Sequence, residues 1–562
     1  MCMQFYQLAA HYTSGMIFQR NRPILIEGKA LTACEITATL DEDSVCVNVR
    51  PGAFSFALPP RPADRGLTLT ITANSMRNGV GRAAPENAKQ AFSGGFAAIG
   101  RTDFELIRYS GKAQTGGDSE NAAGSDSQDA PNNPSPGFVQ TTELTDIYIG
   151  EVWLAGGQSN MQWPLHNTDE YRQNPVVKEN SDLRFYTVGR NIVSSPAEYS
   201  EGYEWAYAAD HGWVGCDEES ALYFSAVAYH FAHTLYDAIK VPIGIINCNV
   251  GGSSIFAWIP CDDIKAIPEI AYIAEAHEIE QAGVDPDAAK SVYYKHLDEI
   301  MKTLDITRNI SGLEGELPVV FNGGPGKYNF HNSGALYNSM LKRVSAFPIR
   351  GMLWYQGETE SSCESGKEYA AALEALVNNM KRRQQNSDFA FNYVQLAPFG
   401  EPTFPYWATV CDQMRKFFLH HPDYAMVTIG DVGCAKDIHP PQKRPVGERL
   451  AYAAMHRSYD LNHEFTGPVA ESAMRLGDEV RISFIHGAGL HQRAMNPGCF
   501  ELAYEDGAVH AAVPEIRGEA VYLPLPEGPT PEYVRYEFVA CPQIGLFNSA
   551  GYPASLFELP VG

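Results

Sequence analysis

The chain has 562 residues, more than one hydrophobic core normally organises, so its length predicts roughly two to four domains. Its 67 acidic and 42 basic residues give a formal net charge of −25. A charge of that sign repels phosphate backbones and anionic membrane surfaces, so neither nucleic acid nor a membrane is expected as a partner. With 44% hydrophobic and 11% aromatic residues, the composition is that of a folded protein.

The N-terminal residues and the cysteines give information about the cellular compartment of the protein. The opening residues lack the basic start and continuous apolar core of a signal peptide, and no segment reaches about 18 uninterrupted apolar residues. The 11 cysteines are an odd number and include no C-x-x-C pair, which favours a reduced protein over a disulfide framework or a zinc site. We therefore expect a cytoplasmic protein, although a chain that had lost its signal peptide would look similar.

Residues 1–142 are predicted to form an N-terminal β domain with a packing or supporting role. Short, partly alternating apolar segments separated by Gly and Pro are typical of a small sandwich, and they occur at residues 23–28, 35–40, 45–49, 53–58 and 67–71. The stretch 111–137 is rich in Gly, Ser, Asn, Asp and Pro and has almost no large apolar residue. It is predicted to be a flexible insert in this domain.

From residue 143 to 460 the pattern changes to apolar strands alternating with helices, which predicts an α/β domain with a mostly parallel sheet covered on both faces. Strands are expected at 151–155, 243–247, 351–355, 391–396 and 426–429. Helices are expected at 220–236, 335–344, 368–385 and 445–458. The region 262–330 is predicted to be a helical insertion whose Tyr and His residues pack rather than react.

The C-terminal region, residues 461–562, returns to β signals. Strands are expected at 479–485, 500–504, 520–524 and 533–538. Two interpretations remain open from the sequence: a third domain, or strands that complete the N-terminal sandwich.

A candidate nucleophile follows the first strand of the α/β region. The strand ends in Gly156 and Gly157, and Ser159 comes two residues later. Glycines let the backbone turn sharply, so that a serine hydroxyl can stand at the mouth of a sheet. Alone, such a serine is more often a turn residue or a helix N-cap. As a nucleophile it needs a histidine nearby in the fold.

Three later stretches could supply the rest of a serine-hydrolase site. Gly252 follows a second strand, where its N–H could meet an oxyanion. Gln356 ends a third strand and could donate its side-chain amide, and Glu358 could orient the same loop. Asp437 and His439 offer a carboxylate and a base. Each stretch lies at or after the carboxyl end of a predicted strand, where open α/β sheets place their ligands.

These stretches resemble the sequence blocks of SGNH hydrolases and, more narrowly, of the sialate O-acetylesterase group. The motifs are Gly157-Gln-Ser-Asn-Met161, Gly251-Gly-Ser253, Trp354-Tyr-Gln-Gly-Glu358 and Asp437-Ile-His-Pro440. The resemblance implies a three-layer α/β/α sandwich of flavodoxin-like form with accessory β-sandwich domains. It also implies a serine esterase that removes acetyl groups from sugar hydroxyls and needs no metal or other cofactor.

The resemblance assigns roles residue by residue. Ser159 is the nucleophile, His439 is the general base and Asp437 orients His439. The N–H groups of Ser159 and Gly252 and the side chain of Gln356 form the oxyanion hole. The wider SGNH pattern places its Asp and His three residues apart, whereas here they are two apart. The acid of the triad therefore stays open, with Asp431 or a backbone carbonyl as alternatives to Asp437.

The substrate is less defined than the chemistry. O-acetylated sialic acid and acetylated xylo- or manno-oligosaccharides are both consistent with the motifs. Gln158, Asn160 and Glu358 are candidate supporting residues, and Trp163 and Trp258 could stack on a sugar or simply pack. A rival of another class is a carbohydrate-binding protein with a catalytically dead hydrolase core. The oligomeric state is not predicted.

Overall fold

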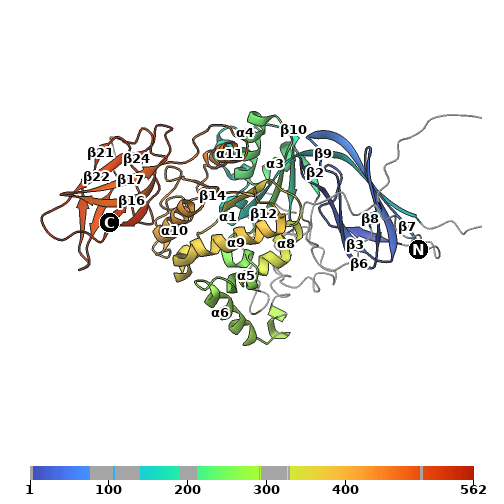
Figure 1. The fold of residues 1–562 in the computed structure, drawn as a ribbon, viewed down its shortest axis with the longest axis horizontal. Coiled ribbons are helices and arrows are strands. Elements are labelled where there is room, and N and C mark those ends of the chain that lie inside the picture. Colours follow the sequence, from blue (N-terminus) through green and yellow to red (C-terminus); the bar gives the residue numbers. More distant parts are fainter. Residues whose placement is uncertain are drawn as a thin grey trace, which may run out of the picture. The chain divides into compact units, whose positions relative to one another are not determined.

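The computed structural model describes residues 4–75, 106–107, 139–189, 212–285, 287–289, 291–292, 326, 329–493 and 498–562 (Figure 1). The chain divides into two compact units, Met1–Met16 with Arg20–Ile149, and Ile17–Gln19 with Gly150–Gly562. The predicted flexible insert at 111–137 and much of the predicted helical insertion lie outside the described residues.

The first unit consists of antiparallel strands, and all five strands predicted for it are present. One sheet has the order β1-β3-β6, with β1 (Tyr6–Leu8), β3 (Ile24–Ala30) and β6 (Gly52–Leu58). The other has the order β9-β7-β4-β5-β8, with the first part of β9 (Val139–Gly157), β7 (Asp64–Ser75), β4 (Cys34–Leu40), β5 (Asp43–Val49) and β8 (Leu106–Ile107). Alternate residues of β4 are buried, as expected for strands with one face on a core.

The second unit is built on a mostly parallel sheet, as predicted. Its strand order is β11-β10-β12-β9-β13-β14-β15, in which β11 runs antiparallel to β10 and the other neighbours are parallel; β2 also pairs with β9. The strands are β2 (Ile17–Gln19), β10 (Asn180–Thr187), β11 (Trp213–Cys216), β12 (Ile243–Asn249), β13 (Gly351–Tyr355), β14 (Ala390–Val394) and β15 (Ala425–Val427). Every residue of β12 and β13 is buried, which explains their unbroken apolar sequences.

Helices lie on both sides of this sheet (Figure 1). On one side, α4 (Ala226–Ile239) and α11 (Arg444–Ser458) pack against each other and against β12 and β14. On the other, α9 (Tyr369–Gln384) packs against α10 (Trp407–His420), a helix that the sequence pattern did not predict. The chain is therefore a mixed α/β protein.

Two predicted helices differ from the structure. The helix expected at 220–236 is interrupted, because Ser225 caps a new helix by accepting a hydrogen bond from the Ala228 N–H at 3.2 Å. The interruption leaves α3 (Glu218–Leu222) and α4 as separate helices. The helix expected at 335–344 contains the π-helical segment η6 (Tyr337–Leu341) before α8 (Lys342–Val344). The described part of the predicted insertion includes α5 (Cys261–Lys265) and α6 (Ala271–Ala282).

The C-terminal strands build their own sheets. One has the order β16-β17-β22-β21 and another β20-β19-β23-β25, while β18 pairs with β24. The strands are β16 (Val469–Leu476), β17 (Glu479–Ile485), β18 (His491–Gln492), β19 (Phe500–Ala503), β20 (Val509–Ala512), β21 (Glu515–Arg517), β22 (Ala520–Pro524), β23 (Tyr533–Tyr536), β24 (Leu546–Phe547) and β25 (Phe557–Pro560). Within the described residues they pair only with one another, so they do not complete the sheets of the first unit.

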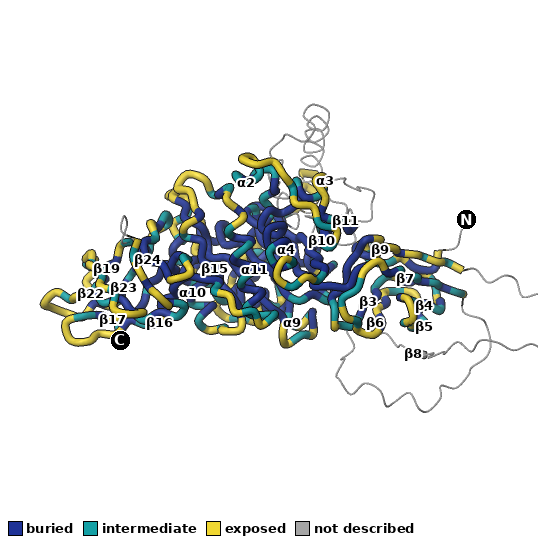
Figure 2. Tube along the Cα trace, turned by 90° about the horizontal axis from the view of Figure 1, so that it is seen from above, coloured by how far each residue is buried: buried dark blue, intermediate teal, exposed yellow. Residues whose placement is uncertain are grey.

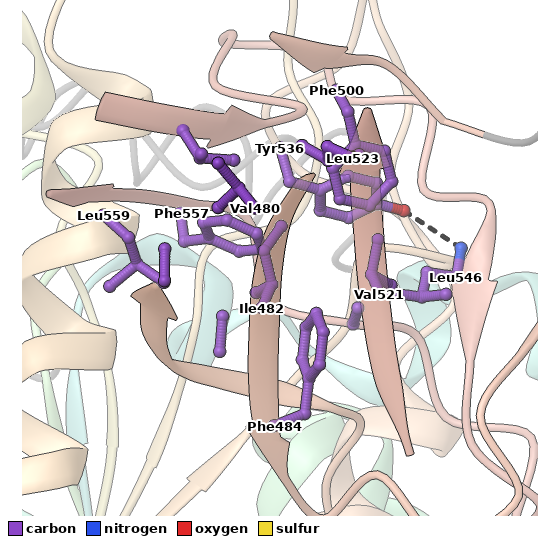
Figure 3. Close-up of a cluster of buried hydrophobic side chains, with 14 of the residues drawn as sticks. Val480, Ile482, Phe484, Phe500, Val521, Leu523, Tyr536, Leu546, Phe557 and Leu559 are labelled. Atoms are coloured by element: carbon purple, nitrogen blue, oxygen red, sulfur yellow. Dashed lines mark hydrogen bonds between the residues drawn. The ribbon is translucent and has the colours of Figure 1, made fainter. Parts of the chain in front are cut away.

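The C-terminal strands contribute aromatic and aliphatic side chains to a shared hydrophobic core (Figure 3). The rings of Phe500 and Tyr536 lie 4.6 Å apart, and Tyr536 and Phe557 lie 5.7 Å apart. The Tyr536 hydroxyl is satisfied in this core because it accepts a hydrogen bond from the Leu546 N–H at 2.9 Å. Figure 2 shows the burial of the described residues: the central strands are buried and the connecting loops are mostly exposed.

Across the described ranges, no helix is both long enough and apolar enough to span a bilayer.

Candidate active site

Three strands of the central sheet end at the same place. In the parallel register, Gly157 at the end of β9 lies opposite Asn249 of β12 and Tyr355 of β13. Gly157 has φ +133°, and a Cβ there would lie 2.0 Å from the Tyr355 carbonyl oxygen, so only glycine fits. The loops that begin at Gln158, Val250 and Gln356 therefore meet at one edge of the sheet, as the sequence predicted.

Ser159 occupies the start of a short helix directly after this turn, α1 (Ser159–Gln162). The turn is held to the sheet by the Gln158 N–H, which donates to the Tyr355 carbonyl at 3.0 Å. Ser159 is partly exposed, and its hydroxyl makes no hydrogen bond to any described residue. The backbone N–H of Ser159 belongs to the first turn of α1, so it has no acceptor within that helix.

Gly252 presents a second unpaired N–H on the neighbouring loop. The preceding residue, Gly251, is fixed by donating to the Gln162 Oε1 at 2.8 Å. Gly252 has φ +70°, and a Cβ there would meet no atom within 4 Å, so the space beside its Cα is open. Among the described residues its N–H has no acceptor. Ser159 and Gly252 are thus available as oxyanion donors.

Gln356 is placed differently from what an oxyanion donor requires. Its side chain is fully buried, and its amide nitrogen faces three acceptors: Glu360, the Ser253 carbonyl at 3.1 Å and the Gln158 Oε1 at 3.2 Å. Its Oε1 accepts from the Tyr369 hydroxyl at 2.7 Å. An amide has two hydrogens, so donation to an oxyanion would require Gln356 to give up one of these bonds.

Neither carboxylate considered from the sequence binds the His439 ring in this structure. Asp437 Oδ1 instead accepts a hydrogen bond from the backbone N–H of His439 at 2.8 Å, which shapes the loop. Asp431 is held by both terminal nitrogens of Arg449, each at 2.7 Å. The ring of His439 stacks on Trp163, with centroids 5.0 Å apart and planes 23° apart. The acid of the triad stays a prediction.

The turn at residues 158–160 (the serine turn) and the loop at residues 437–440 (the histidine loop) are nevertheless joined by a hydrogen bond. The Asn160 Nδ2 donates to the Ile438 carbonyl at 2.9 Å, which links the residue after Ser159 to the residue before His439. Ser159 and His439, both described, make no hydrogen bond to each other here, and such bonds often tighten only when substrate is bound. Burial, followed by the charge of Lys443, lowers the pKa of His439, so the ring is neutral and able to accept a proton over a wider pH range.

Trp258 supports the site from within the protein. It is 1% exposed, and its Nε1 donates to the Ser253 Oγ at 2.9 Å. Stacking of Trp258 on a sugar is therefore not possible in this structure, because the ring has no free face. Trp163 is partly exposed and keeps that possibility.

Sequence reasoning missed Lys443 and Glu360. Lys443 is fully buried four residues after His439, and Glu360 is buried where it accepts from the Ile255 N–H at 2.9 Å. The only sequence signal for Glu360 was its position in the polar loop after β13. No group of three or more His, Cys, Asp or Glu side chains within the described ranges could hold a metal ion.

A parallel sheet whose strands end in a serine turn, two free N–H groups and a histidine loop defines a candidate serine-hydrolase site. Residues 318–456 match the family model described as carbohydrate esterase, sialic acid-specific acetylesterase. The human sialate O-acetylesterase is 25% identical over 356 residues, which cover 59% of this chain and 58% of that protein. The rat sialate O-acetylesterase is 23% identical over 394 residues, 65% of this chain and 68% of that protein.

The fold has a solved counterpart in the crystal structure of a carbohydrate acetylesterase from Xanthomonas citri. The two align with a TM-score of 0.68 and 23% identity over 98% of this chain and 99% of that one. The match to the human relative spans less than three fifths of the length of that protein. The resemblance predicted from the motifs is confirmed: the chain is similar to the sialate O-acetylesterases, and its residues 318–456 match the acetylesterase family model.

Proposed function

We propose that the chain is a serine esterase that removes O-acetyl groups from sugars. His439 takes the proton of Ser159 as its Oγ attacks the acetyl carbonyl, and the N–H groups of Ser159 and Gly252 stabilise the oxyanion. The sugar hydroxyl leaves with a proton from His439. Water activated by the same ring then attacks the acetyl-enzyme and releases acetate.

The observation that carries this proposal is the link between the two loops. The Asn160–Ile438 hydrogen bond of 2.9 Å fixes the chain next to Ser159 against the chain next to His439, and Trp163 of the serine segment stacks on the histidine ring. A carbohydrate-binding protein with an inactive core would need neither the free serine hydroxyl nor a base whose pKa is lowered.

We further propose that residues 143–460 form an SGNH-type domain, a three-layer α/β/α sandwich with accessory β-sandwich domains at 1–142 and 461–562. The parallel sheet with helices on both sides supports this classification. The acid that completes the triad is Asp437 in this proposal, since it already shapes the loop through the His439 N–H and its charge raises the pKa of the ring.

The names of the relatives favour O-acetylated sialic acid as the substrate class, with acetylated oligosaccharides as the alternative. Aromatic faces for a sugar are available beside the serine segment. The ring of His166 lies 5.0 Å from that of Tyr223, and Tyr223 is 47% exposed. Together with Trp163 these rings are the candidate sugar contacts.

The test is acetate release from O-acetylated sialic acid and from acetylated xylo-oligosaccharides, with wild type compared with Ser159→Ala. We expect release from one substrate class and a loss of at least about a thousandfold in the variant. Labelling by a serine-reactive fluorophosphonate should disappear in the same variant. A folded wild type that is neither labelled nor active would favour the carbohydrate-binding alternative, and full activity of Ser159→Ala would remove Ser159 as the nucleophile.

A further inference from the structure

The side chain of Asn160 connects three loops of the candidate site. It is 2% exposed, and its Oδ1 accepts from the Lys443 Nζ at 2.5 Å. Its Nδ2 donates to the Glu358 Oε1 at 2.5 Å and to the Ile438 carbonyl at 2.9 Å. Both hydrogens of the amide are used, so the serine turn, the loop after β13 and the histidine loop are held by one side chain.

Lys443 brings a buried positive charge close to the proposed base. Its side chain is fully buried, with Nζ 5.8 Å from the centroid of the Trp163 ring and 5.6 Å from that of Tyr355. The Trp163 ring is the one that stacks on His439. Burial lowers the pKa of Lys443 to about 7, and the negative charges that oppose this come from Glu358, Asp437 and Glu170.

Glu358 is the buried carboxylate of the same network. It is 1% exposed, and its Oε2 has no hydrogen-bond partner, whereas Oε1 is bound by Asn160. Burial raises its pKa to about 7; the Asn160 bond and the Lys443 charge lower it, and the neighbouring Glu360 raises it. A carboxylate and an ammonium that share one bridging amide compensate each other where neither could be buried alone at low cost.

We propose that Lys443, Asn160 and Glu358 are a positioning network that sets the serine turn against the histidine loop, with Lys443 also acting electrostatically on His439. The inference rests on the proposed esterase function. Asn160 acts through its neighbours Ser159 and Ile438, and none of the three network residues touches the reacting atoms. The charged groups that act on His439 are Lys443, which lowers the pKa of the ring, and Asp437, which raises it.

The first experiment removes the buried charge. With para-nitrophenyl acetate as the substrate, Lys443→Met should lower kcat/KM by about 10- to 100-fold, because Asn160, which links the two loops, loses the donor that fixes its Oδ1. Loss of the positive charge should raise the pKa of His439. The base must be neutral to act, so the acidic limb of the kcat/KM profile should move to higher pH, by about half a unit. The matched control is Lys436→Met, which removes a charge from an exposed position of the same loop.

A double variant separates positioning from stability. Lys443→Met alone leaves Glu358 without its cation, and Glu358→Gln alone leaves Lys443 without its anion. Combining them removes both buried charges, so the melting temperature should recover toward that of wild type. The kcat/KM should stay low, since Asn160 still lacks the lysine donor. Recovery of kcat/KM together with stability would overturn the positioning role.

A titration of His439 tests the electrostatic part without using activity. The pKa of the ring is followed by NMR in protein containing isotope-labelled histidine, with the signal assigned by its absence in His439→Gln. A higher pKa in Lys443→Met, and an unchanged one in Lys436→Met, supports the proposal; equal values in wild type and Lys443→Met overturn it. A wild type that cleaves no ester overturns the esterase proposal and the positioning role together. An active wild type with unaffected Lys443 variants overturns this inference alone.

Discussion

Gln356 has a buried amide that ties two loops of the site to each other. It donates to Glu360 and to the Ser253 carbonyl, and it accepts from Tyr369. Glu360 is 1% exposed, and burial raises the pKa of its carboxyl group. Hydrogen-bond donors such as Gln356 therefore stabilise its buried carboxylate. The loops of the site are therefore held together by buried polar side chains that hydrogen-bond to one another.

Replacing Gln356 by alanine should lower both stability and turnover. The change leaves Glu360 with one donor fewer, and an unsatisfied buried polar group costs about 1–3 kcal/mol in the free energy of unfolding. Urea denaturation measures that loss, and acetate release measures turnover. Gln173→Ala, at an exposed position, is the control and should change neither. Reduced turnover with an unchanged free energy of unfolding would instead support Gln356 as an oxyanion donor.

The packing of α4 against α11 depends on one small residue. Gly447 lies where a Cβ would be 2.5 Å from the Val227 carbonyl oxygen and 2.7 Å from the His230 Cβ. The two helices can approach this closely because α11 has no side chain there. At the scale of elements, this contact fixes the helix that follows the histidine loop.

Gly447→Ala should force the helices apart and destabilise the second unit. Overpacking of this kind costs about 1–3 kcal/mol, which a thermal melt would detect as a lower Tm. Gly283→Ala is the matched control, since Gly283 has φ −81° and an added Cβ there would meet no atom closer than 3.6 Å. That variant should be neutral or slightly stabilised. Equal melting temperatures for the two variants would contradict the prediction.

The C-terminal β region and the α/β sheet belong to one compact unit joined by buried polar contacts. Arg415 of α10 donates to the Ala470 carbonyl at 2.7 Å and pairs with Asp412 at 2.7 Å. Gln395, which follows β14, donates to the Ser555 Oγ at 2.7 Å. At the scale of the whole molecule, these bonds indicate that the two regions of the second unit unfold together.

Arg415→Met should lower the stability of the second unit by about 3–5 kcal/mol, because Asp412 remains buried with a weaker partner. The control is Lys416→Met, which removes the other cation on Asp412 from a side chain that is 44% exposed. An exposed partner contributes only about 0–1 kcal/mol. Calorimetry compares the two, and a similar loss in both variants would contradict the argument.

Much of the fold follows from local pattern. Five strands of the central sheet were predicted from apolar runs, and their ends from the glycines and polar residues after them, whereas β10 and β11 were not predicted. The helix α10 was not predicted, although its buried residues recur at helical spacing, and the break before α4 was missed because the capping role of Ser225 is local chemistry inside an apolar stretch.

Sequence pattern identifies the residues at the ends of the strands: the serine turn, Gly252, Gln356 and the histidine loop. The contacts that hold these residues depend on the fold. The parallel register brings three loops to one edge, and there Asn160 meets Lys443 and Glu358, which lie 283 and 198 residues away along the chain. Such partners have no local period, because a buried amide selects them by distance and burial rather than by spacing in sequence.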